Sequence, residues 1–237
     1  MENIIPCSYR LRLDALYYPA ATALPRKGEY NNDSNDDIMK RYKLLENVKV
    51  HYRKYCEMHE LPFGETMDVP SLLGAMRLYA SPVDWGEGEH LKWMEEHHFA
   101  AKPQNIFNGM GTEVLNGNCL WARMEYAGHS ILFTGDTNKK FADRTDEAYD
   151  LFIKKYGEEL RSDIVKFPHH GRGRDAASQP TKEHLLTKDK NAVCILSGVD
   201  GPELAGKALK KIKVPWLDLN TQNVVYVIRG SGMERIV

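Results

Sequence analysis

A predicted β-hairpin is the feature that most constrains the fold of this chain. Residues 119–126 and 129–134 are strand-like, and only Ala127 and Gly128 separate them. A two-residue connection requires positive φ angles, which glycine adopts at little cost. The second run contains three consecutive apolar residues, 131–133, which predict a buried strand. The sequence therefore predicts a sheet in which these two strands are neighbours.

Helices and strands are predicted to alternate around this hairpin. Apolar residues that recur every three or four positions indicate helices. The predicted helices cover residues 38–61, 87–98, 145–160, 182–186 and 202–212. Short apolar runs bounded by turn residues indicate strands. The predicted strands outside the hairpin cover residues 75–80, 163–167, 192–196 and 224–228, with a loop at 64–70. The alternation predicts an α/β layered domain over residues 38–237, preceded by a loop-rich segment, 1–37.

Charge and composition exclude several classes of protein. Lys and Arg number 32 and Asp and Glu 33, so the formal net charge is −1, without the basic excess of a broad nucleic-acid surface. No apolar stretch approaches the roughly 20 residues that cross a bilayer, and no secretory signal is visible. The 4 cysteines show no C-x-x-C spacing, which argues against a zinc ribbon or a disulfide framework. We expect a cytoplasmic protein without a membrane segment.

Two polar segments directly follow predicted strands. Gly135 and Asp136 come after the hairpin, and the pair His169-His170 comes after the strand at 163–167. Carboxylates and imidazoles bind metal ions, and strand ends are where active sites of layered α/β folds lie. Taken singly, an Asp after a Gly is more typical of a turn, and a histidine pair is more typical of packing or exposure. Together and in this order, the two segments indicate an active site more specifically than either segment does alone.

This order of segments resembles the metallo-β-lactamase-fold hydrolases, in particular the branch that contains the DNA-uptake competence protein ComEC. The likeness spans about residues 38–237 and is most specific over 118–171. Cys119 and Trp121 depart from the small and aliphatic residues of the family's hairpin. The resemblance implies a four-layer αββα sandwich with two metal ions at its edge, usually zinc and sometimes manganese or iron.

The resemblance also implies roles for individual residues. Asp136 matches the carboxylate that bridges both metal ions, while one of His169 and His170 matches a metal ligand and the other faces the substrate. Two cations lower the pKa of a bridging water and bind an oxygen of the scissile bond. Arg172 and Arg174 fit a phosphate-bearing substrate, although a loop of Gly and Arg is equally typical of a flexible segment.

The family's main ligand motif, H-x-H-x-D-H, does not occur in this sequence. The motif precedes the matching segments in the family, so we expect a sandwich that is incomplete in its N-terminal half. His90 and His97, on a predicted helix, are weak candidates to replace it. Asn108 and Asn118 are weaker candidates to replace a ligand of this motif, because an amide is a poor zinc ligand.

Two functions from different classes follow. The first is a metal-dependent hydrolase of a phosphodiester, another ester or a related small molecule, with an incomplete metal site in this chain. The second is a catalytically inactive remnant that serves as a binding or scaffold module. Missing strands would leave an open sheet edge, so we also expect a homo-oligomer or a partner chain that supplies those strands.

Overall fold

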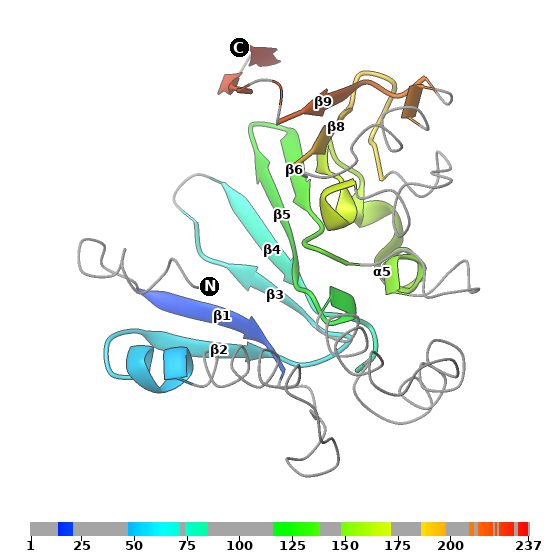
Figure 1. Cartoon of the computed structure of the whole chain (residues 1–237). Coiled ribbons are helices and arrows are strands. Elements are labelled where there is room, and N and C mark those ends of the chain that lie inside the picture. The colour runs from blue at the N-terminus through cyan, green and yellow to red at the C-terminus, as the bar shows by residue number, and fades with distance from the viewer. Residues whose placement is uncertain are drawn as a thin grey trace, which may run out of the picture.

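The fold is mixed α/β and is built on a seven-stranded sheet (Figure 1). The computed structural model describes residues 14–20, 47–71, 74–84, 116–137, 148–171, 186–197, 209–210, 213–219, 221, 223–229 and 232–236. The spatial order of the strands is β3-β4-β5-β6-β7-β8-β9. Their bounds are β3 (Thr66–Val69), β4 (Ala75–Tyr79), β5 (Trp121–Tyr126), β6 (His129–Phe133), β7 (Ile164–Lys166), β8 (Val193–Leu196) and β9 (Trp216–Asp218).

Strand direction changes across this sheet. Neighbours from β3 to β6 are antiparallel, whereas β6, β7, β8 and β9 are parallel to one another. The register places Lys166 of β7 between Phe133 of β6 and Ile195 of β8. Because these four strands run in the same direction, their carboxyl ends meet at one side of the sheet. We call this side, formed by residues 134–137, 168–171, 197 and 219, the carboxyl edge.

A helix covers one face of the sheet. Helix α5 (Ala148–Tyr156) leads into the 3₁₀ helix η1 (Gly157–Leu160), and both bury apolar side chains in one cluster with β6 and β7. Phe152 of α5 stacks on Trp121, with ring centroids 4.1 Å apart and planes 1° from parallel. Trp121 is fully buried and begins β5, so it lies beside the carboxyl end of the antiparallel β6. The core therefore reaches the carboxyl edge.

Two small sheets accompany the large one. β1 (Ala15–Pro19) pairs in parallel with β2 (Glu57–Leu61), and β10 (Tyr226–Arg229) pairs antiparallel with β11 (Gly232–Arg235). Leu61 of β2 is buried in one cluster with Val69 and Leu78 of the large sheet, and Tyr17 of β1 packs against that cluster. The first small sheet is thus joined to β3 and β4 by a common apolar core. Figure 1 shows β1 and β2 next to β3 and β4.

Most predicted elements with local sequence signals are confirmed. The hairpin has the expected two-residue turn, with φ of 50° at Ala127 and 80° at Gly128. The predicted strands at 75–80, 163–167, 192–196 and 224–228 correspond to β4, β7, β8 and β10, and α5 with η1 lies within the predicted helix 145–160. The predicted helix at 87–98, residues 182–185 of the one at 182–186, and most of the one at 202–212 lie outside the described residues, while Leu186 is described and is not helical, with φ of 54°.

Two predictions are wrong, and some strands were not predicted. The helix expected over 38–61 ends at residue 52 in the structure, and Glu57–Leu61 is the strand β2. Leu61 precedes Pro62, which disfavours helical backbone, and β2 finds a distant partner in β1. The loop expected at 64–70 contains β3, whose short alternating pattern buries Val69. β1 lies within the segment expected to be loop-rich, and β9 and β11 were also missed.

Candidate functional site

The turn that follows β6 carries Asp136 at the carboxyl edge. Gly135 has φ of +58°, a left-handed conformation that disfavours side chains. A Cβ at this position would lie 3.2 Å from the Sγ atom of Cys119, a tight approach, so the packing also favours glycine. Burial raises the pKa of the Cys119 thiol, and hydrogen bonds from the Asp136 backbone and the Thr137 side chain oppose that rise. Cys119 therefore serves as a small neutral group beneath the turn.

A chain of hydrogen bonds holds this turn from the core side. The indole Nε1 of Trp121 donates to the hydroxyl of Thr137 at 2.7 Å, and that hydroxyl donates to the carbonyl of Thr134 at 3.0 Å. Trp121 and both threonines are buried. Cys119 and Trp121 thus both contact the turn that presents Asp136.

The turn after β6 and the histidine segment after β7 lie side by side. The backbone N–H of His169 donates to the carbonyl of Gly135 at 3.3 Å, and Thr134 Oγ1 donates to the carbonyl of Lys166 at 2.8 Å. His169 lies in the 3₁₀ helix η2 (Pro168–Gly171) with φ of +46°. The two segments that the sequence singled out are therefore joined by direct hydrogen bonds.

Lys166 is a charged residue of this edge that the sequence analysis did not identify. Its Nζ donates to the carbonyl of Gly135 at 2.5 Å and lies 3.4 Å from Asp136 Oδ1. The Lys166 side chain is 18 % exposed and that of Asp136 is 42 % exposed. Burial lowers the pKa of the Lys166 amine, and the Asp136 carboxylate opposes this shift. A lysine in an otherwise apolar strand before the histidines was the available sequence signal.

Several other candidates cannot be placed at this edge. Arg172, Arg174, His90 and His97 lie outside the described residues, and so does the side chain of His170. Asn118, one of the weaker ligand candidates, is buried, and its amide donates to Asp84 Oδ1 at 3.0 Å. The carboxyl edge thus brings together Asp136, the His169 segment and Lys166.

The residues at this edge do not by themselves complete a metal site. A zinc site takes four ligands, and even a catalytic one takes three of them from protein. Asp136 and His169 supply at most two, and an ammonium already lies against the Asp136 carboxylate. Within the described ranges no three His, Cys, Asp or Glu side chains converge in a way that could hold a metal ion. An ion at Asp136 would need ligands from other residues or from another chain.

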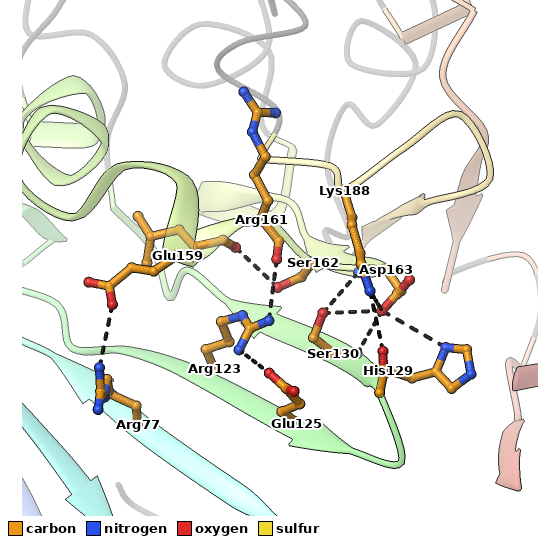
Figure 2. Close-up of polar contacts among 12 residues, drawn as sticks. Arg77, Arg123, Glu125, His129, Ser130, Glu159, Arg161, Ser162, Asp163 and Lys188 are labelled. Atoms are coloured by element: carbon orange, nitrogen blue, oxygen red, sulfur yellow. Dashed lines mark hydrogen bonds and ion pairs between the residues drawn. The ribbon is translucent and has the colours of Figure 1, made fainter. Parts of the chain in front are cut away.

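A second polar cluster lies at the opposite ends of β6 and β7 (Figure 2). One oxygen of the Asp163 carboxylate accepts hydrogen bonds from the Ser130 N–H at 2.7 Å and the Ser130 hydroxyl at 3.1 Å. His129 Nδ1 and Lys188 Nζ lie 3.9 Å and 3.8 Å from the same oxygen. Lys188 also donates to the carbonyl of Gly128 in the hairpin turn at 3.2 Å. These contacts tie the hairpin turn to the start of β7.

Arginines beside this second cluster are compensated by carboxylates. Figure 2 shows Arg123 pointing at Glu125, and Arg77 pointing at Glu159. The first pair is 2.8 Å apart and the second 3.4 Å. Because the cationic groups already have acidic partners, this end of the sheet offers little unbalanced charge to a ligand. We therefore regard the carboxyl edge as the candidate functional site and the second cluster as structural.

Protein-family models and curated sequences identify no relative of this chain. No protein-family model matches the chain, and no curated protein matches its sequence significantly. The metallo-β-lactamase resemblance accordingly remains a prediction that rests on the motifs. Among the helices of the described residues, none has the length and apolar character needed to span a membrane.

Proposed function

We propose that this chain carries the second half of a metal-dependent hydrolase site of the metallo-β-lactamase kind. The observation that supports the proposal is the hydrogen bond between His169 N–H and the Gly135 carbonyl, which joins the Asp136 turn to the histidine segment. The mixed seven-stranded sheet, with α5 on one face, is compatible with one half of an αββα sandwich. The substrate class we propose is a phosphodiester or another ester.

In this proposal each residue has a limited role. Asp136 offers a half-exposed carboxylate, and one residue of the pair His169 and His170 offers an imidazole. Arg172 and Arg174 follow the histidines and would bind the phosphate of a substrate. The remaining ligands would come from other residues of this chain or from a partner chain, and zinc, manganese or iron would be the ion. A second copy of the chain could supply the missing strands.

A second function, a binding or scaffold module without catalysis, is favoured by a different observation. The ammonium of Lys166 already supplies a positive charge at Asp136. Phe133, the last residue of β6, and Leu219, which follows β9 at the carboxyl edge, are each 42 % exposed. An edge that carries a paired carboxylate and exposed apolar side chains is more typical of a contact surface than of an open metal site.

Hydrolysis of bis(p-nitrophenyl) phosphate in the presence of zinc or manganese distinguishes these two functions. The hydrolase proposal predicts release of p-nitrophenol by the wild-type chain and its loss in Asp136→Ala. Asp68→Asn is the matched control, because Asp68 is an exposed carboxylate on β3 paired with Arg77. Turnover that persists unchanged in Asp136→Ala would reject the role of Asp136. No turnover with either ion would favour the binding module.

A further inference from the structure

Lys166 occupies an unusual position for a charged side chain. It ends β7 and is flanked in register by Phe133 and Ile195, both apolar. With only 18 % of the side chain exposed, the stem is largely covered while the ammonium reaches the carboxyl edge. There it donates to the Gly135 carbonyl, the same oxygen that accepts the His169 N–H. One carbonyl thus links the lysine, the Asp136 turn and the histidine segment.

We infer that Lys166 is a positioning residue for Asp136, and that its ammonium supplies the positive charge that a metal ion would otherwise bring to this carboxylate. The ammonium lies 3.4 Å from Asp136 Oδ1 and contacts the backbone of the preceding residue. A partly buried cation beside a carboxylate costs desolvation free energy, and the close pairing offsets that cost. The negative charge of the Asp136 carboxylate is therefore already balanced by a cation of the same chain.

This arrangement has a consequence for metal binding. A divalent ion that approaches Asp136 meets the charge of the Lys166 ammonium and must displace it or share the carboxylate with it. The turn itself has other supports that do not involve the Lys166 side chain: the Thr134 hydroxyl donates to the backbone carbonyl of Lys166, and the Thr137 hydroxyl donates to the carbonyl of Thr134. Removal of the ammonium should consequently leave the turn in place and make metal binding stronger.

A metal-free double-mutant cycle tests the pairing directly. The variants are Lys166→Met, Asp136→Asn and the double variant, and the readout is the unfolding equilibrium constant in urea. If the ammonium holds the carboxylate, the double variant should be destabilised less than the sum of the single variants, with a coupling of about threefold or more. Lys188 and Asp163, 3.8 Å apart with Lys188 48 % exposed, form the control pair, for which we expect a coupling below about twofold.

Additive effects of Lys166→Met and Asp136→Asn would overturn the inference. If Lys166→Met does not fold, Lys166→Gln replaces it, since glutamine keeps an N–H donor for the Gly135 carbonyl and removes only the charge. This part of the test does not depend on the proposed function, because no metal is present.

Zinc titration followed by calorimetry tests the consequence, and this part rests on the proposed function. Lys166→Met should bind zinc about fivefold or more tightly than the wild-type chain, because the repulsion between two neighbouring cations is removed. Lys188→Met should bind as the wild-type chain does. If a folded Lys166→Met bound zinc as tightly as the wild-type chain or more weakly, the inference that the Lys166 ammonium competes with a metal ion for Asp136 would be overturned. If neither chain binds zinc, the proposed hydrolase fails, while the metal-free cycle still decides the role of Lys166.

Discussion

Replacement of Trp121 by phenylalanine probes the support beneath the candidate site. The substitution keeps an aromatic ring that can stack on Phe152, but it removes the indole N–H that donates to Thr137 at 2.7 Å. It also leaves space in a core where Trp121 is fully buried. Thr137 keeps its own hydrogen bond to the Thr134 carbonyl, so the turn should loosen without being lost.

The magnitude follows from these two losses. A hydrogen bond within a buried site contributes about 1 kcal/mol to stability. The space vacated by the smaller ring should cost a further 1–2 kcal/mol or so, because the surrounding core relaxes only in part. Trp121→Phe should therefore lower the free energy of unfolding by about 2–3 kcal/mol. Thr137→Val, which removes the acceptor of the same hydrogen bond and the donor to Thr134, should cost about 2 kcal/mol.

Urea unfolding followed by far-ultraviolet circular dichroism measures both effects. The double variant should be destabilised by about 1 kcal/mol less than the sum of the two single variants, because both remove the same hydrogen bond. Tyr55→Phe, at a position that is 69 % exposed, should change the free energy of unfolding by less than about 0.5 kcal/mol. A loss below about 0.5 kcal/mol for Trp121→Phe would refute the support that we assign to this side chain.

Three further predictions concern the turn, the second polar cluster and alkaline pH. Gly135→Ala should lower the free energy of unfolding by about 1–2 kcal/mol, since alanine is strained at φ of +58°; an unchanged urea midpoint would contradict this. Asp163→Ala should lower the free energy of unfolding by about 2 kcal/mol, because two Ser130 donors lose their acceptor. An unchanged free energy of unfolding would show that the second polar cluster does not contribute to stability. Burial raises the pKa of Tyr79, Tyr156 and Cys194 to about 12 each, above their ordinary values of 10.0, 10.0 and 9.0. The unfolded chain therefore loses these protons first, so stability should be intact below about pH 9 and fall as the pH rises toward 12; urea midpoints that stay constant over this range would contradict the assignment.

Local signals were sufficient to predict the elements nearest the site. The turn at Ala127 and Gly128 determines the pairing of β5 with β6, and β7 is a short apolar run closed by a proline. β2 was not predictable in the same way, because its residues also fit a helical period and become a strand only through pairing with β1. β3 and β9 have only four and three residues, too few for a periodic signal.

The sequence was sufficient to predict two residues of the candidate site, but not the contacts that these residues make. Asp136 and His169 were predicted as site residues because they are metal-binding residue types that directly follow predicted strands. The parallel pairing of β6 with β7 then places them together. Lys166 was missed, since its contact with Asp136 depends on the backbone turn at Gly135 and on the register of β7. The same turn explains Trp121, whose role as a hydrogen-bond donor is invisible until Thr137 is placed beneath it.

The measurement that tests the proposed function most directly is the number of zinc ions bound per chain after equilibrium dialysis. The proposal predicts about two ions if other residues or a second copy complete the site, and loss of metal in Asp136→Ala. It also predicts that a chelator lowers the stability of the wild-type protein, because an ion held only by the folded chain stabilises that state. Less than about one ion per chain, together with unchanged stability after chelation, would contradict a metal-dependent hydrolase and leave Asp136 without a role as a metal ligand.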